Sequence, residues 1–96
     1  MKPELRVGMC LKWKANPGDP VHSYKMLLAE EKPDRHNPSF RALEVSDVPE
    51  TPSISIGRFT SSWDNWYHWE PCTQSEFDAA RLRVLTTMDN LVQHAR

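Results

Sequence analysis

The residues best suited to chemistry in this chain are its two cysteines and four histidines, the types that build metal centres and nucleophilic active sites. His68 and Cys72 are separated by three residues, a spacing that resembles a pair of zinc ligands. Cys10 and His22 would have to complete the site, but each stands alone in the sequence, whereas zinc ligands usually come in tight pairs. The sequence therefore predicts no metal site.

A cysteine nucleophile needs a histidine that can remove its proton. His68 precedes Cys72, but Pro71 lies between them at the expected end of a strand, so their side chains have no reason to converge. The glycines are too scattered for a phosphate-binding loop: Gly8, Gly18 and Gly57. We expect two free, part-buried thiols, no catalytic residue, no cofactor and no enzymatic activity.

Composition sets further bounds on the function. The 96 residues carry a formal charge of −1, which gives no basic excess for binding duplex DNA. The N-terminal stretch lacks the apolar run of a secretory signal, and no window approaches the roughly 20 apolar residues of a membrane span. We therefore expect one domain spanning residues 1–96, a cytoplasmic location and no membrane partner.

Aromatic residues are concentrated between Ser61 and Thr73, in the stretch SSWDNWYHWEPCT, which holds three of the four tryptophans. Aromatic side chains dominate the energetics of protein interfaces. The predicted partner-binding residues are Trp63, Asp64, Trp66, Tyr67 and His68. The alternative is structural: Tyr67 and Trp69 fill the core, Trp66 covers the end of a helix and Trp63 closes a loop.

Nucleic acid is the second class of partner that the sequence suggests. Lys12, Trp13, Lys14 and Arg58, together with the other aromatics, could form a stacking platform with basic flanks, as in small barrels that bind single strands. Asp64, Glu70 and the neutral overall charge oppose contact with a phosphate backbone.

Alternation of apolar and polar residues predicts five short strands, separated by proline-rich loops. They cover residues 5–14, 22–31, 39–47, 53–60 and 66–70. The second could also be a helix, because its centre is rich in helix-forming residues. In the fourth, Ile54 and Ile56 are expected to face inward, Gly57 to mark a bulge or bend, and Phe59 to rejoin the same face. Pro71 is expected to end the fifth strand.

The last third of the chain changes to a helical period over residues 73–95. Thr73 and Glu76 form a capping box, which predicts the start of the helix. Apolar residues then recur at a spacing of three and four on one face, which is expected to be continuous: Phe77, Ala80, Val84, Leu85, Met88, Leu91, Val92 and Ala95. Arg81 interrupts this face and Leu82 lies off it, so these two residues are candidates for the seam of a homodimer.

These patterns predict an α+β fold: a strongly bent antiparallel sheet or SH3-like half-barrel of about five short strands, followed by one C-terminal amphipathic helix. The β-rich part would span residues 5–70. The predicted function is macromolecular binding without catalysis, as a protein-binding adaptor or inhibitor of the kind that mobile elements encode. A small-barrel protein that binds single-stranded nucleic acid is the alternative.

Overall fold

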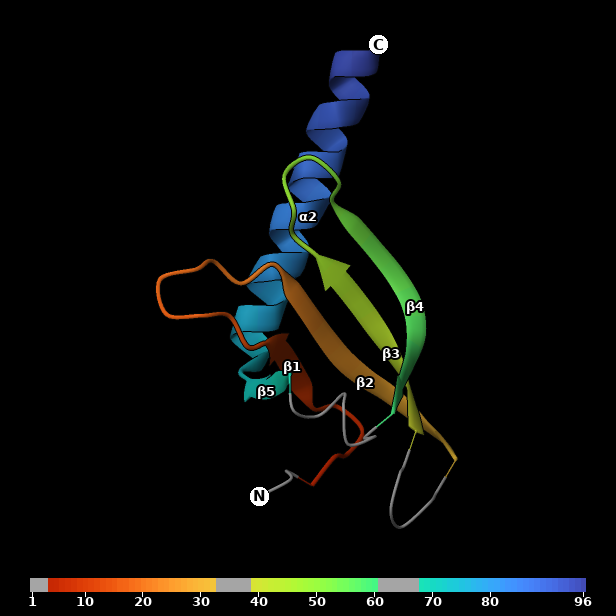
Figure 1. The fold of residues 1–96 in the computed structure, drawn as a ribbon. Coiled ribbons are helices and arrows are strands. Elements are labelled where there is room, and N and C mark those ends of the chain that lie inside the picture. Colours follow the sequence, from red (N-terminus) through yellow and green to blue (C-terminus); the bar gives the residue numbers. More distant parts are fainter. Residues whose placement is uncertain (1–3, 33–38, 61–67) are drawn as a thin grey trace.

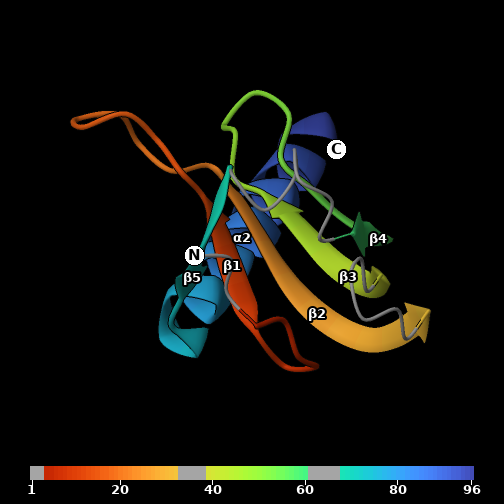
Figure 2. The same ribbon diagram turned by 60° about the horizontal axis from the view of Figure 1, so that its bottom comes forward.

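The computed structural model describes residues 4–32, 39–60 and 68–96. Its elements are β1 (Cys10–Trp13), β2 (Ser23–Lys32), β3 (Ser39–Ser46), β4 (Ser53–Thr60), β5 (Trp69–Cys72) and α2 (Gln74–Ala95). The strands form one antiparallel sheet in the order β4-β3-β2-β1-β5, and α2 crosses one of its faces (Figures 1 and 2). The predicted five-stranded sheet and C-terminal helix are confirmed. The sheet does not close into a barrel, and the SH3-like half-barrel stays a prediction.

Strand β2 is the centre of the sheet. It pairs with β1 on one side and β3 on the other, which settles the choice between strand and helix in favour of a strand. The pairing with β3 shifts register between Leu27 and Ala29 and again between Glu30 and Lys32. Such irregularities increase the local twist and bend of a sheet. The bend allows a narrow sheet to enclose a core.

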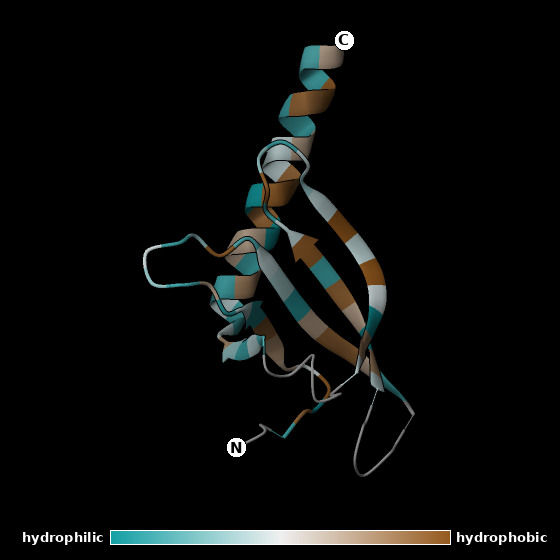
Figure 3. Ribbon diagram, in the orientation of Figure 1, coloured by the Kyte–Doolittle hydropathy of each residue, from teal (hydrophilic) through white to brown (hydrophobic). Residues whose placement is uncertain are grey.

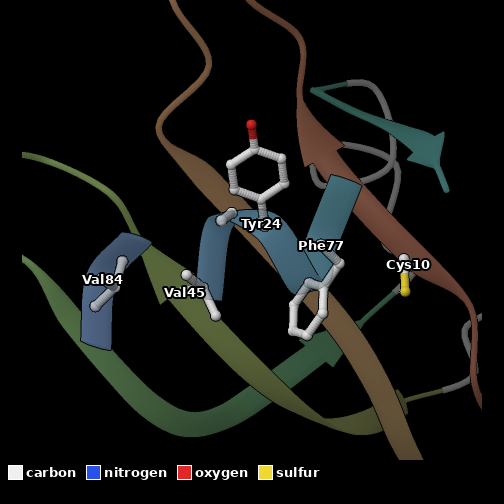
Figure 4. Packing of buried hydrophobic residues seen from close by; sticks show 6 residues of the cluster. Cys10, Tyr24, Val45, Phe77 and Val84 are labelled. Carbon is white, nitrogen blue, oxygen red and sulfur yellow. The ribbon is translucent and has the colours of Figure 1, made fainter. Parts of the chain in front are cut away.

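The first core lies between the sheet and α2. Cys10, Tyr24 and Val45 point from β1, β2 and β3 toward the helix, which contributes Phe77 and two smaller residues (Figure 4). The helical residues of this core are Phe77, Ala80 and Val84, each fully buried. Their spacing of three and four places them on one side of α2, so this side holds the helix against the sheet.

A second core occupies the opposite face of the sheet. Its buried members are Leu11, Leu27, Phe40, Ala42 and Phe59, and Leu5, Met9 and Trp69 pack against them. Because side chains alternate along a strand, Leu11 faces away from its neighbour Cys10, and both are buried. Strand β1 is therefore buried on both faces at this point, although the alternation in its sequence predicts a half-buried strand.

The prediction for β4 was partly wrong. Ile54 packs against the helix-side core, but Ile56, two residues further on, is 58% exposed. The pairing of β3 with β4 runs without a register shift, so Phe59 falls opposite Phe40 and faces the second core. Gly57 marks no bulge in this pairing. It lies where an added Cβ would meet the Glu44 carboxylate, so a glycine permits that close approach.

The expected end of the fifth strand was also wrong. Pro71 lies inside β5, opposite Leu11, rather than after it. Proline lacks an N–H donor and is tolerated only where a strand needs no further pairing on that side. As β5 is an edge strand with β1 as its one neighbour in the sheet order, it meets this requirement.

The capping box at the start of α2 is confirmed. Thr73 has an extended backbone, and its Oγ1 accepts a hydrogen bond of 3.1 Å from the Glu76 N–H. This bond satisfies one of the donors that a first helical turn leaves unpaired. The Glu76 carboxylate also accepts a hydrogen bond of 3.0 Å from Lys12 Nζ, which ties the first turn to β1.

The second half of α2 extends beyond the sheet (Figure 1). The helix has 22 residues, or about 33 Å at 1.5 Å per residue, whereas the outer strands of a five-stranded sheet lie about 19 Å apart. The apolar pattern continues past the last buried residue, Val84, toward the C-terminal end (Figure 3). Only the first half of the predicted continuous apolar face packs against the sheet, because Leu85, Met88, Leu91 and Val92 are exposed.

Truncation of buried Phe77 should destabilise the protein much more than truncation of an exposed apolar residue. We expect Phe77→Ala to lower the free energy of unfolding by about 3 to 5 kcal/mol, because it leaves a cavity between α2 and the sheet. Ile56→Ala removes an exposed side chain and should cost about 1 kcal/mol or less. Urea unfolding followed by circular dichroism measures both, and equal losses would contradict this packing.

Candidate functional site

The most prominent exposed aromatic group lies at the end of β1. Trp13 is 41% exposed, and its ring stacks on that of His68 with centroids 5.0 Å apart and planes inclined by 15°. His68 is exposed and directly precedes β5. Its carbonyl accepts a hydrogen bond of 2.8 Å from the Lys14 N–H, which fixes the backbone beside the Trp13 ring. The stack is therefore positioned by main-chain pairing as well as by ring contact.

A second ring contact connects this exposed stack to the interior. Trp13 lies opposite Trp69 in the β1–β5 register, and their rings meet edge to face at 5.4 Å. Trp69 is half-buried and makes a similar contact, at 6.2 Å, with the buried ring of Phe59. Edge-to-face geometry is favoured by the charge distribution of aromatic rings. The rings thus continue from the second core to the surface. We call Trp13, His68 and Trp69 the aromatic edge.

Lys25 contacts the aromatic edge through the ring of Trp69. Its Nζ lies 5.0 Å from the centroid of the Trp69 ring and 5.6 Å from that of Phe59, within the range of cation–π attraction. The same ammonium group forms an ion pair of 2.9 Å with Glu44, and its side chain is only 16% exposed. Lys25 therefore holds Trp69 in place.

The basic residues predicted to flank the aromatics do not gather into one stripe. Lys12 points to the helix side of β1, away from Trp13, where it pairs with Glu76. Arg58 lies on β4, at the other edge of the sheet from β5, and pairs with Glu31 at 3.2 Å. Of the four predicted residues, Trp13 is part of the aromatic edge and Lys14 lies beside it, through its N–H bond to the His68 carbonyl.

Of the five predicted partner-binding residues, the structure places only His68. The other four, Trp63, Asp64, Trp66 and Tyr67, lie outside the described residues. Trp69, which the structural alternative assigned to the core, is half-buried and contacts both Phe59 and the exposed Trp13. Arg81 and Leu82 are exposed on α2.

The two thiols are neighbours in the structure. Cys10 and Cys72 are directly opposite each other in the β1–β5 pairing, and both are free. Burial raises the pKa of the Cys72 thiol to about 11, with smaller contributions from Cys10 and from the Glu76 carboxylate. Burial, followed by the charge of Asp78, also raises the pKa of Cys10. Both groups are therefore neutral thiols at physiological pH, the opposite of an activated nucleophile.

Among residues 4–32, 39–60 and 68–96, no group of three or more histidine, cysteine or acidic side chains is placed to hold a metal ion. His22, the other histidine considered as a ligand, contacts the Asp47 carbonyl through Nδ1 at 2.9 Å. In the same part of the chain, no helix combines the length and apolar character that crossing a bilayer requires.

Comparison with protein-family models, with curated proteins and with solved structures finds no match for this chain.

Sequence reasoning named a homodimer seam at Arg81 and Leu82 but did not predict that the second half of α2 would project from the sheet. The sequence does contain a signal for this, because a 22-residue helix is longer than a five-stranded sheet is wide. It also missed Lys25, whose position under Trp69 depends on pairing between distant strands and has no local pattern.

The raised thiol pKa values predict slow alkylation. A rise from 9.0 to about 11 lowers the thiolate fraction of Cys72 about a hundredfold near neutral pH, and thiolate is the reacting species. Iodoacetamide should label Cys72 about a hundredfold more slowly in the folded protein than in urea, with a rate that keeps rising up to about pH 11. Peptide mass spectrometry measures this rate, and rapid labelling of the folded protein at pH 7.5 would contradict the geometry.

The Lys12–Glu76 contact predicts a pH effect at the start of α2. The hydrogen bond from Lys12 is the main cause that holds the pKa of Glu76 below its ordinary 4.5. Because the folded pKa is depressed, the stabilisation is present above pH 4.5 and is lost as the pH falls through the lowered value.

Replacing Lys12 tests this assignment. We expect Lys12→Met to raise the pKa of Glu76 toward 4.5, measured by NMR titration of its side-chain carbonyl. The matched variant Lys14→Met, which leaves the Lys12 contact in place, should change this pKa little. An unchanged value in Lys12→Met would contradict the contact.

Proposed function

We propose that this chain is a non-enzymatic protein-binding module, an adaptor or inhibitor that contacts its partner through the aromatic edge. The observation that carries the proposal is the stacked pair of Trp13 and His68, exposed at the β5 side of the sheet and connected to the core through Trp69. Trp63, Asp64, Trp66 and Tyr67 directly precede His68 in the chain, and we include them in the proposed contact surface.

The geometry of the aromatic edge suits a binding role. A tryptophan anchor contributes most when it presents a large area without losing much conformational freedom on binding. Trp13 is already held between the rings of His68 and Trp69, so little rotational entropy remains to be lost. A partner with an apolar pocket would match such an exposed, positioned ring.

The distribution of charge favours protein over nucleic acid as the partner. Several basic side chains of the described residues already pair with carboxylates: Lys12, Lys25, Arg41, Arg58 and Arg83. A phosphate backbone would have to compete with those carboxylates and would be repelled by them. The stacked rings alone suit either partner, and the paired cations are the observation that favours a protein partner.

Binding would act by recruitment or by steric occlusion. The thiols, which lie on the helix side of the sheet, have raised pKa values and offer no activated nucleophile. A short chain that masks a surface of its target fits the regulatory proteins that mobile elements encode.

The proposal predicts that Trp13→Ala abolishes partner capture. Loss of one interface anchor typically costs 2 kcal/mol or more, or about 30-fold in affinity. We would compare proteins captured from lysate by the wild type, by Trp13→Ala and by His68→Ala, with and without nuclease. A nuclease-resistant partner that both variants lose supports the proposal.

Ile56→Ala is the matched control, since it removes an exposed apolar side chain from β4 at the other edge of the sheet. It should retain the partner, and melting curves should show that all variants are folded. Capture that disappears with nuclease and weakens steeply with salt would replace the proposal with single-stranded nucleic-acid binding.

A further inference from the structure

The projecting part of α2 forms a second exposed surface, separate from the aromatic edge. Beyond Val84, α2 leaves the sheet, and its large apolar side chains Leu85, Met88, Leu91 and Val92 are exposed, as is Leu82 just before it. Single exposed apolar residues are common on protein surfaces, but Leu82, Leu85, Met88 and Val92 lie on one flank of the helix, and a contiguous group of this kind marks an interaction site. The exposed fractions of Leu82 and Leu85, 65% and 47%, show that neither is covered by the sheet.

One flank of α2 combines these apolar residues with two charges. Seven-residue spacing places Leu85 and Val92 along the same line of the helix. On either side of Leu85 lies a pair made of one charge and one apolar residue: Arg81 with Leu82, and Met88 with Asp89. All of these residues are exposed.

Arg81 and Asp89 belong to the charges of α2 that are unpaired among the described residues. Within the described part of the chain, Arg81 and Asp89 form no ion pair, whereas Lys12 and Arg83 each contact a carboxylate. Eight residues separate Arg81 from Asp89, or about 12 Å along the helix, so they are too far apart to neutralise each other. A partner that supplies the opposite charges in reverse order would pair with both.

A second copy of this helix in the antiparallel direction has that order. With Leu85 packed on Leu85 of the second copy, each Arg81 falls opposite an Asp89 and each Leu82 opposite a Met88. A parallel pair would place Arg81 against Arg81 and Asp89 against Asp89, so the charges select the antiparallel direction. We propose that this flank of α2 is the interface of an antiparallel homodimer centred on Leu85.

The sheets leave room for this arrangement. Each sheet covers α2 only between Phe77 and Val84, on one side of the proposed centre. In an antiparallel pair the two sheets therefore lie toward opposite ends, and the projecting half of each helix lies beside the sheet-bound half of the other. The interface is two-fold symmetric, as expected of a homodimer. It is separate from the aromatic edge, so its success or failure is independent of the function proposed above.

Sedimentation velocity on the full chain over a range of concentrations tests the dimer. The wild type should sediment as a dimer that dissociates on dilution. Leu85→Glu should raise the dissociation constant roughly 30-fold or more, the effect of losing a central contact and burying two like charges. The matched control Asn90→Glu introduces the same charge at an exposed position about 140° around the helix from Leu85, away from the proposed interface, and should leave the dimer intact.

Charge reversal tests the register. Arg81→Asp and Asp89→Arg, made singly, each replace two attractive contacts with two repulsive ones and should each weaken the dimer about tenfold. The double variant restores both pairs with reversed signs and should recover most of the wild-type affinity. Circular dichroism checks that every variant keeps its helix.

A wild type that stays monomeric up to millimolar concentration would overturn the proposal. A dimer that is unaffected by Leu85→Glu, or one that the double charge reversal fails to restore, would overturn the interface and its register. Trp13→Ala should leave sedimentation unchanged, which keeps this test distinct from that of the aromatic edge.

Discussion

The mismatch between the length of α2 and the width of the sheet shapes this molecule. The helix needs only Phe77, Ala80 and Val84 to dock, and two ion pairs secure it, from Lys12 to its first turn and from Arg83 to Asp47 at 2.7 Å. The hydrogen bond to Asp47 raises the pKa of the Arg83 guanidinium, so that group stays protonated in the ion pair. Beyond Val84 the helix is not covered by the sheet, so the apolar side chains of its second half are exposed to solvent.

The sheet itself is buried on both faces, and this explains the aromatic edge. A narrow sheet covered on one side by a single helix must bury its second face with its own curvature and with the segment before β1. That second core reaches solvent at the β5 side through a series of ring contacts from Phe59 to Trp69, Trp13 and His68. The exposed stack is thus an extension of the core, which makes it rigid.

The charges that we assign to binding differ from the ion-paired charges named above in that they form no ion pair among the described residues. The ion pairs of Lys12, Arg58 and Arg83 are at least partly exposed, so each contributes little to stability but occupies a cation, and the Lys25–Glu44 pair is more buried. This occupancy argues against a phosphate-binding stripe. Arg81 and Asp89 lack such partners among the described residues, and their spacing on α2 is what gives the projecting helix a preferred partner and direction.

The sequence by itself determined the elements, because local physics specifies them: alternation produced the five strands, and the Thr73–Glu76 capping box produced the start of α2. It also named Trp13 and His68, but not their contact. Tertiary structure decided what depends on strand pairing and sheet width: the exposure of Ile56, Pro71 within an edge strand, and the exposure of the second half of α2. These features result from register and from distances between segments far apart in the chain, which no local period contains.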